Sequence, residues 1–231
     1  MKTIGLLGGM TWESSVIYYQ IINREIQKRL GGLHSAKILL HSFDFEDIAS
    51  FQRDGKWSDA GAYLAVAGHS LVKAGAEFLV LCCNTMHCVS DAIEKEAGVP
   101  LLHIADPLGA AVRSADLSCV GLLGTRYTME MPGVVRDRLT DKYGLRVLVP
   151  EGEDAAELHR IIYEELGCGK FLDSSRAACR HIIARLVARG AQGVVLGCTE
   201  LPLILQPEDS TVPQFDTMAL HARAIVDLAL S

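Results

Sequence analysis

The chain contains two copies of one sequence pattern, and each copy ends in a cysteine. Residues 73–85 read KAGAEFLVLCCNT, and residues 188–200 read ARGAQGVVLGCTE. Without any gap, Cys83 aligns with Cys198, 115 positions further along the chain. Each copy is an apolar run followed by small polar residues, which predicts a buried strand that opens into a turn.

The repetition extends beyond the cysteines. Residues 4–8, IGLLG, match residues 120–124, VGLLG, 116 positions later, and the Val-Pro pair at 99–100 recurs at 212–213. Offsets this steady predict two halves of one architecture, because the period is far too long for a solenoid array. A duplicated architecture can build a catalytic site or a plain binding cleft.

Apolar and amphipathic segments alternate in both halves. We expect strands at residues 3–8, 36–45, 78–82, 101–104, 120–123, 145–149 and 194–196. We expect helices after caps at Thr11, Ser58 and Ser174, and also at 85–97, 129–143, 154–166 and 218–230. This alternation is typical of parallel sheets with helices on both faces. Ligands of such sheets bind outside the carboxyl ends of the strands.

The predicted fold class is therefore α/β. We expect two similar doubly wound parallel-sheet domains related by a pseudo-two-fold, with the active site in the cleft between them. The predicted domains are residues 1–108 and 109–216, with the closing helix 217–231 packing back on the first.

The composition of the chain limits the kinds of partner that we expect it to bind. The net charge of −6 argues against a nucleic-acid partner, which would need clustered basic residues. No uninterrupted apolar stretch is long enough to cross a bilayer. Glycines interrupt the first apolar run, which resembles a core strand more than a signal peptide. We therefore expect a cytoplasmic protein, without a membrane partner, whose seven cysteines are reduced thiols.

The paired cysteines suit proton transfer at a carbon next to a carboxylate. One sulfur as thiolate takes the proton, and the other as thiol returns one on the opposite face. We expect a helix to begin after each cysteine, which would stabilise a thiolate and bind a carboxylate. A single such cysteine is more simply a core residue, whereas a matched pair favours function.

The remaining candidates are polar residues near the predicted strand ends. The hydroxyl and amide groups that could hold a carboxylate, or simply cap turns, belong to Asn84, Thr85, Thr125 and Thr199. We expect Gln52, Arg53 and Lys170 in loops that could recognise a substrate side chain, although a solvated loop charge explains Arg53 and Lys170 equally well. Gly8 and Gly9 would let the backbone approach a small ligand. A metal site at Cys83, His87 and Cys88 is disfavoured, because no CxxC pair is present.

Three segments, CCNTMH, GCTE and MKTIGLLGGM, resemble the pyridoxal-independent aspartate/glutamate racemase family. The LGTRYTM segment points to the aspartate racemase-like branch, and Glu200 replaces a histidine of the glutamate racemase branch. The resemblance implies a homodimer that uses no cofactor and acts on aspartate or glutamate by a two-base mechanism. It assigns the bases to Cys83 and Cys198, and substrate contacts to Met10, Asn84, Thr85 and Thr199.

Other interpretations stay open. A hydantoin racemase, a maleate isomerase or a decarboxylase would use related thiol chemistry on a different acid. A binding or sensing protein without turnover is the alternative of a different class.

Overall fold

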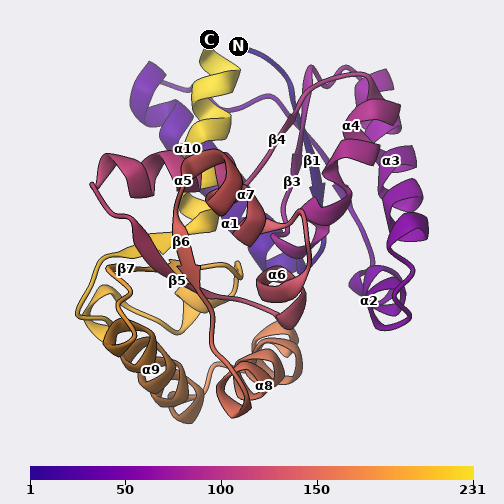
Figure 1. Cartoon of the computed structure of the whole chain (residues 1–231). Helices are drawn as coiled ribbons and strands as arrows, with labels where there is room; N and C mark the ends of the chain where they lie inside the picture. The colour runs from indigo at the N-terminus through magenta and orange to yellow at the C-terminus, as the bar shows by residue number, and fades with distance from the viewer. The chain divides into compact units, whose positions relative to one another are not determined.

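A computed structural model describes all 231 residues of the chain. The residues form two compact units (Figure 1). Unit 1 consists of Met1–His103 and His221–Ser231, and unit 2 is Ile104–Leu220. The domain limits after residues 108 and 216 stay predictions, because compactness alone does not show where an independently folding domain ends.

The sheet of unit 1 has four parallel strands in the order β2-β1-β3-β4. They are β1 (Ile4–Gly8), β2 (Ile38–Ser42), β3 (Phe78–Leu81) and β4 (Leu101–Leu102). Their helices are α1 (Trp12–Leu30), α2 (Phe45–Arg53), α3 (Trp57–Lys73) and α4 (Ser90–Ala97), the last preceded by a 3-10 helix, Thr85–Val89. Parallel pairing requires such crossover connections between consecutive strands.

Helices cover both faces of this sheet. Leu7, Leu79 and Leu81 belong to a buried cluster with residues of α3 and α4. The final helix, α10 (Thr217–Leu230), contacts α1 through a hydrogen bond between Tyr18 and His221 and an ion pair between Arg29 and Asp227. Alternate strand residues therefore face different helix layers, as the period of a strand demands.

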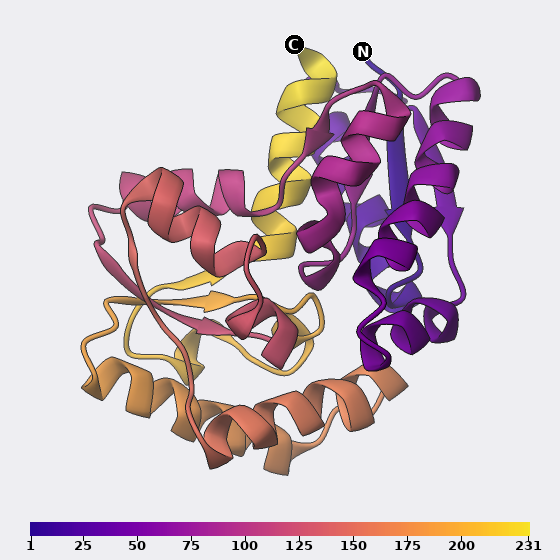
Figure 2. The same ribbon diagram turned by 45° about the vertical axis from the view of Figure 1, so that its right-hand side comes forward.

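The sheet of unit 2 repeats the same arrangement, with the order β6-β5-β7-β8. Its parallel strands are β5 (Cys119–Leu123), β6 (Arg146–Leu148), β7 (Gly193–Leu196) and β8 (Gln214–Asp216). Its helices are α5 (Ala105–Ser114), α6 (Arg126–Glu130), α7 (Val135–Tyr143), α8 (Glu153–Arg160) and α9 (Asp173–Ala188). Figure 2 shows α5 and α7 on one side of this sheet and α8 and α9 on the other. The predicted class, two similar parallel α/β units, is confirmed.

Several predicted boundaries were wrong. Ser58 and Ser174 do not cap their helices; each lies one residue inside, at the second helical position. The predicted helix 129–143 is two helices, α6 and α7, because Pro132 and Gly133 interrupt it and Gly133 has φ of +74°. Where one helix was predicted at residues 154–166, the α-helix α8 ends at Arg160 and a π-helical turn, Ile161–Glu165, follows. None of the helices is both long and apolar enough to cross a membrane.

Candidate active site

In unit 1, two neighbouring strands end side by side at the carboxyl edge of the sheet. Leu7 of β1 is in register with Leu81 of β3, and the backbone N–H of Cys82 donates to the carbonyl of Leu7 at 2.9 Å. The chain leaves β1 through Gly8 and Gly9, and it leaves β3 through Cys82 and Cys83. Since β2 and β3 flank β1 on opposite sides, this edge is the topological switch point where α/β sheets bind ligands.

The glycines after β1 have an internal role. A Cβ atom on Gly9 would lie 2.3 Å from the carbonyl oxygen of Phe43, and Gly9 has φ of +90°. A Cβ atom on Gly8 would lie 2.7 Å from Oγ of Ser15, and that hydroxyl accepts a hydrogen bond from the Gly9 N–H at 2.8 Å. We expected these glycines to make room for a ligand, but the close neighbours are other parts of unit 1.

The adjacent cysteines after β3 have different surroundings. Cys82 has no exposed surface, and burial raises the pKa of its thiol well above the ordinary value. Cys83 retains 8% exposure. Nδ1 of His87 donates to the carbonyl oxygen of Cys83 at 2.8 Å, which anchors the turn that carries the sulfur. Burial also raises the pKa of the Cys88 thiol, to about 12. Cys83 is therefore the candidate for a reactive thiol in this segment.

Sequence reasoning missed a group of buried imidazoles behind this turn. The His87 and His103 rings lie 4.5 Å apart between centroids, and the His221 ring lies 5.9 Å from that of His87. Nε2 of His221 donates to the carbonyl of Leu102 at 2.9 Å, so its Nδ1 accepts from the Tyr18 hydroxyl at 3.0 Å. No sequence spacing links these residues, because they come from distant segments.

In unit 2, the corresponding strand ends carry Thr125 and Cys198. The backbone N–H of Gly197 donates to the carbonyl of Leu123 at 2.7 Å, as Cys82 does in unit 1. The hydroxyl of Thr125 caps α6 by accepting from the N–H of Thr128 at 3.2 Å. The structure thus gives Thr125 the capping role that we weighed as its alternative. Cys198 has 8% exposure, the same as Cys83.

A buried carboxylate lies beside Cys198. Its sulfur donates to Oε2 of Glu200 at 2.8 Å, and the Thr199 hydroxyl donates to the same oxygen at 3.0 Å. Glu200 itself has only 5% exposure. Sequence reasoning noted Glu200 only as a departure from a related branch. The available signal was the alignment of the two copies, in which this carboxylate stands at the position of Thr85.

The helices expected after the cysteines are shorter than predicted. A 3-10 helix of five residues follows Cys83 before α4 begins, and a 3-10 helix of three residues, Leu201–Leu203, follows Cys198. A helix dipole depends on aligned peptide units over several turns. The prediction that a helix N-terminus stabilises a thiolate at Cys198 is therefore wrong.

The other predicted binding residues are divided between core and surface. Met10, Asn84, Thr85 and Thr199 are buried at the strand ends of their own units. Gln52 is buried in α2, where its Nε2 atom donates to the sulfur of Met86 at 3.2 Å. The Arg53 guanidinium forms an ion pair with Glu46 on the surface of α2. Lys170 is exposed in the loop before α9.

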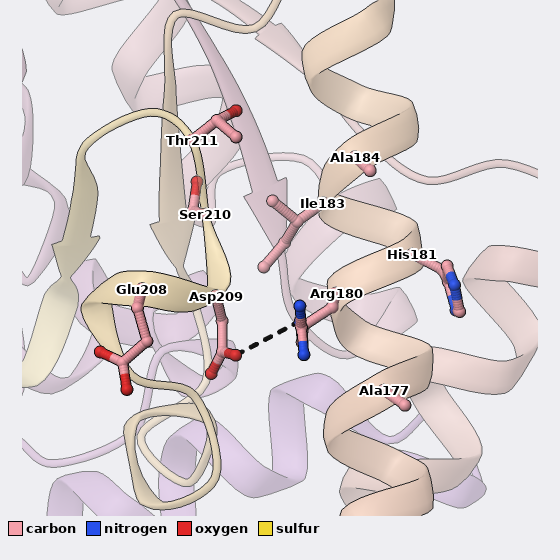
Figure 3. Close-up of a pocket in the computed structure, with 9 residues that line it drawn as sticks. All are labelled: Ala177, Arg180, His181, Ile183, Ala184, Glu208, Asp209, Ser210 and Thr211. Atoms are coloured by element: carbon pink, nitrogen blue, oxygen red, sulfur yellow. Dashed lines mark ion pairs between the residues drawn. The ribbon is translucent and has the colours of Figure 1, made fainter.

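One surface pocket of unit 2 is separate from these residues. It has a volume of about 390 Å³ and lies between α9 and residues 208–211 (Figure 3). Its Arg180 forms an ion pair with Asp209 at 3.4 Å, and Arg176 donates to the same carboxylate at 2.8 Å. Arg176 also forms an ion pair with Glu208 at 3.6 Å, so two arginines are balanced by two carboxylates. Throughout the chain, no group of three or more His, Cys, Asp or Glu side chains is arranged to hold a metal ion.

Comparison with known proteins agrees with this architecture. The family model for Asp/Glu/hydantoin racemases matches residues 7–225. A solved structure from Yersinia pestis, described as a candidate Asp/Glu racemase, is 49% identical, with both chains covered completely and a TM-score of 0.92. An aspartate racemase homologue from Pyrococcus horikoshii OT3 is 34% identical over the whole of both chains, with a TM-score of 0.83. A glutamate racemase from Koribacter versatilis is 30% identical, over 69% of this chain and 54% of its own length.

The repeated α/β units with a cysteine at equivalent strand ends are thus those of a racemase fold. The chain belongs to the Asp/Glu/hydantoin racemase family. Racemases are isomerases, so the protein is an enzyme of the isomerase class.

Proposed function

We propose that the protein is a cofactor-independent amino-acid racemase that acts on aspartate or glutamate through Cys83 and Cys198. The observation that supports this most is the matched placement of the two cysteines. Each follows the strand beside the first strand of its sheet, and each has 8% exposure. A core role gives no reason for that match, whereas a two-base reaction needs two equivalent sulfurs.

In the proposed reaction, one cysteine is a thiolate and the other a thiol. The thiolate removes the α proton from one face of the substrate, and the thiol delivers its own proton to the opposite face. The mechanism requires both sulfurs to reach the same α carbon. The intermediate carbanion needs fixed hydrogen-bond donors around the substrate carboxylate. Side chains of Asn84 and Thr85 are the proposed donors, with Met10 and Thr199 as neighbouring contacts and Thr125 through its hydroxyl.

The proposed substrate is a small dicarboxylic amino acid. Relatives named for aspartate and for glutamate support this class. The cation that binds the distal carboxylate is proposed to be Lys170, with Gln52 as a polar partner. Arg53 is a weaker candidate, because its guanidinium already pairs with Glu46.

We also propose that the enzyme is a cytoplasmic homodimer. Its exposed α1 side chains support a self-association surface: Trp12, Val16 and Tyr19 are spaced as one helical face and are 64%, 45% and 51% exposed. Contiguous apolar surface of this kind marks interaction sites on soluble proteins. The seven free cysteines are consistent with a reducing compartment.

A substrate panel tests the proposed activity. Each enantiomer of aspartate and glutamate is incubated with the enzyme without added cofactor, and the enantiomers are separated by chiral chromatography. We expect racemisation of at least one of these amino acids, whichever enantiomer is the starting material. Hydantoins, maleate and a substituted malonate form the comparison set. Activity confined to that set, or tight binding of an amino acid without any turnover, would reject the proposal.

A further inference from the structure

The two cysteine-bearing strand ends differ in one charged residue. In the aligned copies, Glu200 of unit 2 stands at the position of Thr85 in unit 1. The Glu200 carboxylate is buried, and its Oε2 atom accepts hydrogen bonds from the sulfur of Cys198 and the hydroxyl of Thr199. The aligned position therefore holds a carboxylate in contact with Cys198 in unit 2 and a hydroxyl side chain in unit 1.

A carboxylate in contact with sulfur affects the two protonation states of a thiol in opposite ways. It accepts a hydrogen bond from the S–H group, which stabilises the thiol, and it repels the thiolate. The repulsion is strong here because both groups are buried, so that water screens the charges poorly. The matching side chain near Cys83, that of Thr85, is an uncharged hydroxyl and exerts no such repulsion.

We propose that Glu200 is a positioning residue that keeps Cys198 protonated in the free enzyme, so that Cys198 starts as the proton donor and Cys83 as the base. This inference rests on the two-cysteine mechanism proposed above. The α C–H bond breaks, and its proton forms an S–H bond with Cys83. The S–H bond of Cys198 breaks, and its proton joins the opposite face of the α carbon. The resulting state has a thiolate beside Glu200 and is the less stable of the two bound states.

This asymmetry has a distinct kinetic signature. Enantiomers have equal free energies in solution, so kcat/KM must be the same for both in every variant. If one bound state is less stable, the two enantiomers therefore differ in kcat, and they differ in KM by the same factor. Glu200→Gln removes the charge and should bring both ratios closer to one. A general structural fault would lower kcat/KM for both enantiomers without moving these ratios in that direction.

Thiol labelling tests the inference directly. Limiting iodoacetamide is added at neutral pH, and the modification of each cysteine is followed by peptide mass spectrometry. Cys83 and Cys198 are equally exposed, so their labelling rates can be compared directly within the native protein. We expect Cys83 to react at least about tenfold faster than Cys198, which corresponds to one unit of thiol pKa. Glu200→Gln should accelerate labelling of Cys198 by about the same factor. Glu208→Gln, the same charge change at a surface position, should not.

Equal labelling, or faster labelling of Cys198, in the native protein would overturn the inference. An unchanged Cys198 rate in folded Glu200→Gln would overturn it as well, and if that variant does not fold, the native ratio decides. Labelling needs no turnover, so a failure of the proposed function can be distinguished from a failure of the proposed role of Glu200. A protein that shows the expected ratio but racemises nothing refutes the proposed function, whereas an active racemase without the ratio refutes only the role of Glu200.

Discussion

Single residues show which parts of the site a sequence can reveal. Cys83 and Cys198 stood out because the chain repeats itself around them, and the structure gives both the same exposure. The contact between Cys198 and Glu200 could not be foreseen, since it depends on the side-chain rotamer that brings the carboxylate back to the sulfur. The close contact of Gly9 with Phe43 could not be foreseen for a similar reason, because Phe43 comes from a segment distant in sequence.

Gly9 provides a prediction about stability. Gly9→Ala should lower the free energy of unfolding by about 3 kcal/mol or more, because a left-handed φ and a backbone clash add together. Gly144→Ala is the matched control: Gly144 has φ of +63°, but a Cβ atom added there would meet no other atom within 4 Å. Its cost should be about 1 kcal/mol. Chemical denaturation of the two variants measures both values, and equal costs would show that the contact with Phe43 is unimportant.

Cys88 provides a prediction about reactivity. Burial raises the pKa of its thiol to about 12, so roughly one molecule in ten thousand carries the thiolate at pH 8. Cys88→Ala should therefore leave racemase activity within about twofold of the native value, and the Cys88 peptide should label far more slowly than that of Cys83. Rapid labelling of Cys88, or loss of activity in a folded Cys88→Ala variant, would contradict this assignment.

At the scale of elements, helices and strands with a clear hydrophobic period were predicted correctly, whereas short or irregular elements were not. Long amphipathic helices such as α1 and buried strands such as β3 lie where the sequence predicted them. The strand β8 was missed, because three half-buried residues give no clear alternation. The 3-10 helices after the cysteines were taken for α-helices, because local sequence does not distinguish the first turn of either.

The contact between α5 and α7 carries a prediction about pH. Asp106 of α5 accepts two hydrogen bonds from Arg138, at 2.8 and 2.7 Å, and one from Lys142 at 2.9 Å. Partial burial alone would raise the pKa of Asp106, but these two cations outweigh it and hold the pKa well below its usual value. A carboxyl group with a lowered folded pKa stabilises the fold above its unfolded pKa, near 3.9, and loses that contribution as the pH falls through the folded value.

Asp106→Asn should therefore cost about 2 kcal/mol of unfolding free energy at neutral pH, and the difference from the native protein should shrink below about pH 4. Asp141→Asn, the same charge change at an exposed position of α7, should cost less than about 0.5 kcal/mol. Urea denaturation at several pH values provides the comparison. A penalty for Asp106→Asn that is independent of pH would contradict an electrostatic origin.

For the whole molecule, the duplication was the most reliable signal. Offsets near 115 positions predicted two similar units, and both sheets have the same strand order with the cysteine after the equivalent strand. The family assignment followed from the same motifs. Oligomeric state was beyond this reasoning, because it depends on surface shape, so the homodimer stays a proposal.

The proposed dimer surface can be tested on the full chain. Replacing Val16 and Tyr19 of α1 by lysine places two charges on the exposed apolar face without disturbing buried residues of the helix. We expect the native protein to sediment as a dimer and the double variant as a folded monomer, since buried unpaired charges are costly. A native monomer, or a double variant that remains dimeric, would exclude this surface.

The most direct test of the two-cysteine mechanism is α-proton exchange in heavy water. The native enzyme should introduce deuterium at the α carbon of either enantiomer of its substrate and invert that centre, as followed by proton NMR and chiral chromatography. Cys83→Ala and Cys198→Ala, each shown to be folded, should abolish inversion from both enantiomers. Full racemisation by either variant would contradict the mechanism.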